Sequence, residues 1–152
     1  MLEHAGGTAD REIALLKAGS ERLMRAHIDS IPDGTYSATA IVDSDGIVDR
    51  PLELVLDVTV SGSDIHFDLS RSSPPCSGPM NSVWATTQSA VYVAMKHIFP
   101  DVPINAGCFA PIHIAPPDGT FLYARYPRPV AGCAAEGLSR LNPRVAPPIQ
   151  SR

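Results

Sequence analysis

The sequence predicts an α+β domain in which an antiparallel β-meander packs against two main helices. Two amphipathic stretches have helical periodicity, and three strand-like stretches joined by short turns lie between them. Hydrophobic residues make up 44% and charged residues 18% of the chain, which is typical of a folded protein. The order of helix, strands, helix and strands is that of an α+β fold. We expect one domain over residues 1–136 and an irregular, proline-rich tail over residues 137–152 that could remain disordered.

The first helix is predicted from about Thr8 to Ser30. Its apolar positions recur at spacings of three, four and seven, while the charged residues lie elsewhere. These apolar positions are Ile13, Leu16, Leu23 and His27 or Ile28. The segment Pro32-Asp33-Gly34 has turn residues and should end the helix.

Three strands should follow the first helix. Residues 35–42 are small and β-branched, and residues 51–60 alternate strictly between apolar side chains and mostly polar ones. The alternation resumes at Ile65 after the short segment Ser61-Gly62-Ser63, which predicts an antiparallel hairpin. The first strand is expected to extend this hairpin into a meander.

A second helix is predicted to begin after Asn81, a natural N-cap residue, and to end before Pro100. Lys96 and His97 then fall in its last turn, where cations suit the helix dipole. Its apolar stripe comprises Val83, Thr87, Ala90, Val91, Ala94 and Ile98. Short strands are expected at residues 112–115 and 121–124.

Charge and composition exclude several classes of protein. A formal net charge of -4 and the absence of a basic stripe argue against nucleic-acid binding. No apolar run is long enough to cross a bilayer, and the polar start is unlike a signal peptide, so we expect a cytoplasmic location. Three widely spaced cysteines suggest reduced thiols. Neither a Gly-x-Gly-x-x-Gly nor a Walker A pattern is present, so no motif predicts ATP binding by this chain.

Local candidates for chemistry each have a simpler structural explanation. His66 and Asp68 lie on one face of a predicted strand, with Asp64 beside them, as metal ligands could, but a solvated strand face explains them more simply. Cys76 could lie near a helix N-terminus that lowers its pKa, although a buried packing role is commoner. His113 should face away from the core.

The loop Asn105-Ala106-Gly107-Cys108-Phe109-Ala110-Pro111 is the sharpest local candidate for binding. Its Asn and Gly would allow tight backbone conformations that aim amide groups at a ligand or a neighbouring segment. The alternative is a structural connection between helix and strand. The residues that we expect to contribute to any local binding are Asn81, Asn105, Gly107 and Cys108.

Several segments together resemble consecutive landmarks of the hydantoinase B/oxoprolinase family, which includes the related subunits of acetone and acetophenone carboxylases. Their order and approximate spacing fit from about Ser20 to Glu136. These segments are Glu21-Arg22-Leu23-Met24-Arg25, Ile31-Pro32-Asp33-Gly34-Thr35-Tyr36, Asp68-Leu69-Ser70-Arg71-Ser72-Ser73-Pro74, Gly78-Pro79-Met80-Asn81, Ser89-Ala90-Val91-Tyr92 and Asn105-Ala106-Gly107-Cys108-Phe109. The chain departs from the family at Ala110, where an Arg is usual, and after Glu136.

This resemblance implies a role in ATP-dependent opening of cyclic amides such as hydantoin and oxoproline, or in ketone carboxylation. It implies a hydantoinase A-type partner subunit that binds ATP, and a divalent metal in the complete enzyme. The chain resembles only a middle segment of such a subunit, without the family's metal-binding motifs, so we expect a fragment or remnant that is inactive alone. The alternatives are a non-catalytic interaction or homo-oligomerisation module and, less favoured, a self-sufficient hydrolase that uses Cys76 or Cys108 with a histidine.

Overall fold

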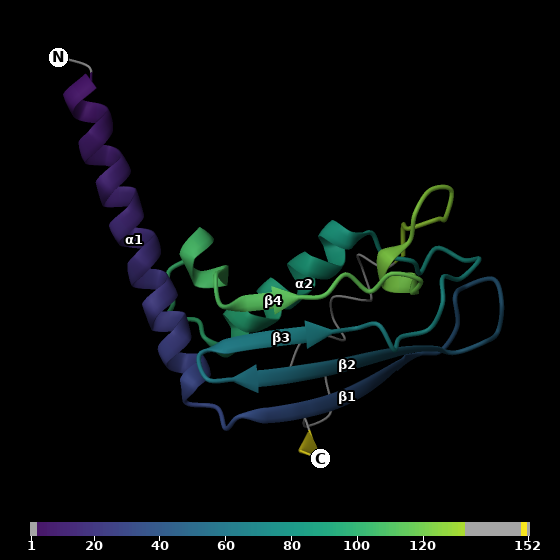
Figure 1. The fold of residues 1–152 in the computed structure, drawn as a ribbon. Helices are drawn as coiled ribbons and strands as arrows, with labels where there is room; N and C mark the ends of the chain where they lie inside the picture. Colours follow the sequence, from purple (N-terminus) through teal and green to yellow (C-terminus); the bar gives the residue numbers. More distant parts are fainter. Residues whose placement is uncertain (1–2, 133–149, 152) are drawn as a thin grey trace.

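The computed structural model describes the backbone of residues 3–132 and 150–151, and the side chains of residues 8–132. The predicted tail therefore lies almost wholly outside the described residues. The elements are α1 (Glu3–Asp29), β1 (Gly34–Val42), β2 (Leu52–Ser61), β3 (Asp64–Asp68), α2 (Trp84–Ile98), the 3-10 helix η1 (Ala106–Phe109), β4 (Ile112–Ile114), the 3-10 helix η2 (Phe121–Tyr123) and β5 (Gln150–Ser151). Two main helices and a sheet confirm the predicted α+β class (Figure 1).

The strands form one mixed sheet in the order β4-β3-β2-β1-β5. The predicted meander is confirmed, because β2 pairs antiparallel with both β1 and β3. Strand β4 instead pairs parallel with β3, with Ile65 opposite Ile112 and Phe67 opposite Ile114. A parallel neighbour needs a crossover connection, and α2 lies within the connection here.

The strand predicted at residues 121–124 is wrong, because residues 121–123 form η2. The Thr120 hydroxyl caps this short helix by accepting a hydrogen bond from the Leu122 N–H. The neighbouring backbone bonds to loops rather than to a strand: the Phe121 N–H donates to the Ser73 carbonyl and the Ala124 N–H to the Ser82 carbonyl.

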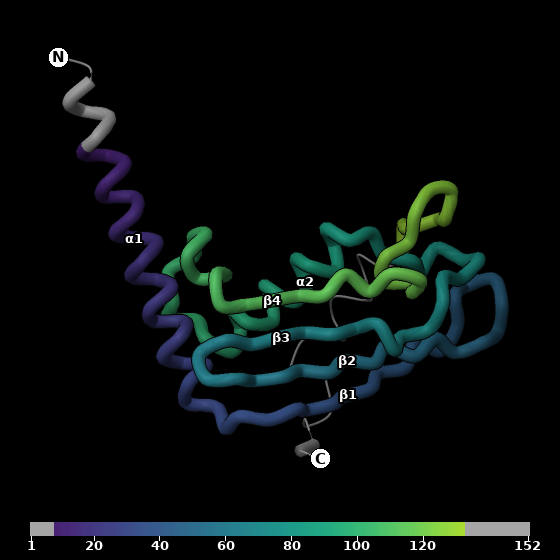
Figure 2. Tube along the Cα trace, in the orientation of Figure 1, coloured from purple at the N-terminus to yellow at the C-terminus, as the bar shows by residue number. Residues whose placement is uncertain are grey.

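The C-terminal half of helix α1 contacts the body, whereas the turns that begin at Thr8 project beyond the sheet (Figures 1 and 2). The described side chains from Thr8 to Ala18 are exposed, whereas Met24 and Ile28 are fully buried. The predicted helix is therefore confirmed, but the first two residues of its apolar stripe, Ile13 and Leu16, do not enter the core. The core around Met24 and Ile28 includes residues from β2, β3, α2, η1, β4 and the segment between α2 and η1: Val58, Val60, Ile65, Phe67, Val91, Met95, Val102, Cys108 and Ile112.

Helix α2 begins at Trp84, three positions beyond Asn81, so the capping role predicted for Asn81 is wrong. The N-cap residue is Val83, which has no side chain that could bond to the helix. Lys96 lies in the last turn as expected, and its ammonium group donates to the carbonyls of Phe99 and Val102. These bonds fix the chain as it leaves the helix.

A second core lies where the end of β1 and the start of β2 meet two other segments, the loop after β3 and the 3-10 helix η2. It contains Val42, Leu52, Leu54, Leu69, Cys76, Met80, Phe121 and Leu122. Neither described helix combines the length and the apolar character that a membrane span would require.

Candidate functional site

The segment from Asn105 to Cys108 joins α1 to the rest of the protein. The side-chain oxygen Oδ1 of Asn105 accepts the Gly107 N–H at 2.8 Å and so caps η1. The side-chain nitrogen Nδ2 of Asn105 donates to Ser20 Oγ on α1 at 2.7 Å. A Cβ at Gly107 would lie 2.0 Å from the Lys17 carbonyl oxygen, so only glycine lets the two backbones approach this closely. Cys108 is fully buried in the first core.

These contacts account for three of the four residues that the sequence singled out for binding. The side chain of Asn105 uses both its acceptor and its donor within the chain, and Cys108 is not accessible. The geometry is that of the structural connection which the sequence left as the alternative. A binding role for these residues stays a prediction.

Asn81 lies in a separate region, at the end of the loop before α2. Its side chain is fully buried and holds the loop in shape. Oδ1 accepts the Cys76 N–H at 2.9 Å, and Nδ2 lies within hydrogen-bonding distance of the carbonyls of Cys76, Gly78 and Pro129 at 2.9–3.0 Å. Asn81 therefore joins its own loop to a segment almost fifty residues further along the chain.

Asp45 holds the same loop from the other side, although no motif in the sequence indicated this role. Asp45 is only 3% exposed. Its carboxylate accepts the N–H groups of Ile47 and Val48 in its own turn, and those of Ser77 and Gly78 in the loop before α2. The bonds from Val48, Ile47 and Gly78 lower the pKa of Asp45, so the ionised form is the one that fits. The approach is close here too, because a Cβ at Gly78 would lie 1.8 Å from the Asp45 carbonyl oxygen.

The two described cysteines are not set up as nucleophiles. Burial raises the pKa of the Cys76 thiol, and the nearby negative charge of Asp45 raises it further. Cys76 belongs to the second core and Cys108 to the first. The packing role that the sequence favoured for Cys76 agrees with these surroundings.

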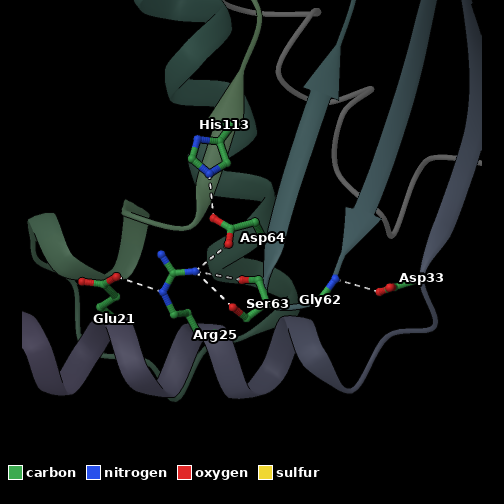
Figure 3. A network of polar contacts seen from close by, with 7 residues as sticks. All are labelled: Glu21, Arg25, Asp33, Gly62, Ser63, Asp64 and His113. Carbon is green, nitrogen blue, oxygen red and sulfur yellow. Dashed lines mark hydrogen bonds and ion pairs between the residues drawn. The ribbon is translucent and has the colours of Figure 1, made fainter.

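Charged side chains join α1 to the turn between β2 and β3 (Figure 3). The Arg25 guanidinium donates to Glu21 at 2.9 Å, to Asp64 at 2.8 Å and to the Ser63 hydroxyl at 3.1 Å. His113 Nε2 lies 2.7 Å from the other oxygen of Asp64. The hydrogen bond with His113 and then the one from Arg25 lower the pKa of Asp64, so its charge favours the docked position of α1.

The proposed metal ligands His66 and Asp68 lie on the exposed face of β3. The His66 ring stacks on His113, with ring centroids 4.5 Å apart and planes at 19°, and Asp68 Oδ1 accepts the Ser70 N–H at 2.8 Å. Across residues 8–132, no three His, Cys, Asp or Glu side chains gather as metal ligands. The side chains described here therefore do not fit a divalent metal.

Known proteins share the sequence pattern and the fold of this chain. A family model described as hydantoinase B/oxoprolinase matches residues 3–145. The chain is similar to caprolactamase subunit beta of Pseudomonas jessenii, with 31% identity over 136 residues, and to 5-oxoprolinase 1 of Arabidopsis thaliana, with 27% identity over 134 residues. These alignments cover 88% and 80% of this chain.

Two solved structures have the same fold. The crystal structure of the ATP-dependent caprolactamase from Pseudomonas jessenii aligns with a TM-score of 0.77 and 29% identity over 92% of this chain. A nucleotide-free acetone carboxylase aligns with a TM-score of 0.64 over 76% of this chain, and its 19% identity supports the fold alone. The chain spans only 23% of the caprolactamase subunit and 11% of the oxoprolinase.

Proposed function

Because the chain belongs to the hydantoinase B/oxoprolinase family, we propose that it forms a scaffold layer of an ATP-dependent hydrolase of cyclic amides. The substrates would be rings such as hydantoin, oxoproline or a lactam, and the chain would act beside a hydantoinase A-type subunit that binds ATP. The single observation that carries this proposal is the family match, which extends over the described body from α1 to η2.

The chemistry of the substrates explains the need for ATP. Amide resonance makes the carbonyl carbon a poor electrophile and the nitrogen a poor leaving group. ATP bound by the complete enzyme would supply a phosphoryl group to the amide oxygen, which weakens that resonance and makes hydrolysis feasible. The described residues do not fit a divalent metal, so we assign no step of the reaction to a metal on this chain.

The contacts within the chain support a structural contribution rather than a catalytic one. Asn81 and Asp45 use their polar atoms to hold two loops together, and Asn105 uses its polar atoms to hold α1. Cys76 and Cys108, the candidate nucleophiles, are buried. We therefore propose that the chain is inactive alone and positions the catalytic parts of a complete subunit, including part of its contact with the ATP-binding partner.

A chimera tests this proposal. The matched segment of the Pseudomonas jessenii caprolactamase subunit beta would be replaced by this chain, and ATP-dependent hydrolysis of caprolactam would be measured with its partner subunit present. We expect the chimera to assemble and to retain activity, whereas the isolated chain with ATP should show no turnover of caprolactam, hydantoin or oxoproline. A chimera with Gly107→Leu is the control, because it should lose the docking of α1 and with it the activity.

Two results would contradict the proposal in different ways. Turnover by the isolated chain that disappears in Cys76→Ala or Cys108→Ala would make it a self-sufficient enzyme. A folded chimera that does not bind the partner subunit would exclude a role in the subunit contact.

A further inference from the structure

One turn of α1, from Ile13 to Leu16, presents apolar side chains on every side of the helix. Successive residues of an α-helix are rotated by about 100°, so four consecutive residues cover the whole circumference. Ile13 is 49%, Leu15 64% and Leu16 69% exposed, and Ala14 is exposed as well. A helix that is apolar all round is normally buried. This segment, which we call the apolar turn, is therefore a surface that another body should cover.

The described body does not cover the apolar turn. Asn105 and η1 contact α1 immediately after it, at Ser20 and at the Lys17 carbonyl. Leu15 precedes the buried residue Met24 by nine positions and so lies about 180° from it on the helix, directed away from the body. The apolar turn lies in the part of α1 that projects beyond these contacts (Figure 2).

A single neighbouring helix could not cover this turn. Two helices that pack along a seam bury one stripe of each, whereas Ile13 and Leu15 lie about 160° apart on α1. A second copy of α1 would leave one of these two side chains in water, and on the side of Ser20 it would meet Asn105 and η1. The partner must enclose the turn from more than one side, as the interior of a larger body does.

The longer relatives contain such a body, because this chain spans less than a quarter of caprolactamase subunit beta and shares its fold. Resting on the function proposed above, we propose that the apolar turn inserts into the remainder of a hydantoinase B-type subunit and is enclosed there by at least two segments. Its receiving site is an apolar pocket about one helical turn deep. The rim of that pocket meets the charged residues on either side of the turn, which are Asp10, Arg11, Glu12 and Lys17.

The chimera described above tests this inference with Leu15→Glu and Leu16→Glu, each made both in the chimera and in the isolated chain. In the isolated chain both positions are exposed, and Leu and Glu have similar helix propensity, so the urea midpoint should not change. In the chimera each substitution should reduce the yield of folded subunit and the hydrolysis of caprolactam at least tenfold, because a carboxylate would enter an apolar pocket. Leu15→Met and Leu16→Met are the matched controls and should retain activity, since they keep the apolar surface.

The outcomes separate this inference from its alternatives. Normal folding and activity of either Glu variant in the chimera would overturn it, because one side of the turn would then lie in water. A folded Glu variant that has lost only the ATP-binding subunit would assign the turn to that subunit instead. A dimer of the isolated chain that both Glu variants abolish would assign the turn to a second copy.

A second set of variants keeps this inference distinct from the proposed function. Failure of the unsubstituted chimera to assemble would contradict the proposed function. Glu is therefore also introduced into caprolactamase subunit beta itself, at the positions aligned with Leu15 and Leu16. At least tenfold loss of folded subunit there supports the enclosed turn, and unchanged folding overturns it.

Discussion

Substitution of Gly107 by Ala should separate α1 from the body. The new Cβ would lie 2.0 Å from the Lys17 carbonyl oxygen and 2.6 Å from the Lys17 carbonyl carbon, both of which are backbone atoms and cannot rotate away. Normal contact would require a displacement of about 1.4 Å, which lengthens the 2.7 Å bond between Asn105 and Ser20 beyond hydrogen-bonding distance. Strained packing at ~1–3 kcal/mol and one lost hydrogen bond at ~1 kcal/mol give a destabilisation of about 2–4 kcal/mol.

Urea unfolding followed by circular dichroism would measure this change in the free energy of unfolding. The matched control is Gly19→Ala on α1 itself, where a Cβ meets nothing within 4 Å. This control should be neutral or stabilise by up to about 1 kcal/mol, because Ala is the better helix former. If Gly107→Ala lies within about 0.5 kcal/mol of the wild type, the close approach of the two backbones is not what holds α1.

Three further outcomes follow from the loop before α2 and from the thiols. Asn81→Ala should cost about 2–4 kcal/mol in urea unfolding, because it removes the partner of the buried Cys76 N–H and of several carbonyls, and a cost below about 1 kcal/mol would contradict the role of Asn81. The pKa of Asp45 is lowered from its ordinary 3.8 in the folded state, so its contribution to stability is complete above that value and is lost as the pH falls toward the folded pKa. Acid unfolding should therefore be less steep below about pH 4 in Asp45→Asn, and an unchanged slope would show that another group is responsible. In a Cys133→Ser background, Cys76 and Cys108 should react with a thiol reagent only on unfolding in urea, whereas rapid reaction in buffer would contradict their burial.

Local patterns predicted the elements that depend on neighbouring residues. Alternation over residues 51–60 and the short turn at Gly62 indicated the hairpin of β2 and β3, and both strands were found. Turn residues also indicated where α1 ends, because Pro32 cannot continue a helix and Gly34 adopts a positive φ of 155°. These features follow from backbone preferences over a few residues, which the sequence carries directly.

The sequence-based prediction failed where a distant contact determines the local conformation. Asn81 is a typical helix cap by residue type, but its amide is committed to Cys76 and Pro129, so α2 begins without a side-chain cap. Residues 121–123 have the composition of a strand, yet the Phe121 backbone bonds to the loop residues Ser73 and Ser82, and Thr120 caps the segment as a 3-10 helix. The periodicity of α1 likewise indicated an apolar face but not how much of that face the body covers.

The same distinction explains why the family could be predicted from sequence more readily than a site. Two of the landmark segments contain glycines at which one backbone contacts another: Gly107 against Lys17, and Gly78 against Asp45. Any side chain at either position would separate the segments, so these motifs specify how parts of the chain that are far apart in sequence meet. A motif with that role identifies a fold with high specificity and yet places no reactive group in front of a substrate. The catalytic groups of the proposed hydrolase should therefore be sought in the parts of the longer relatives that this chain does not span. The contribution of this chain itself should be measured as subunit assembly rather than as turnover.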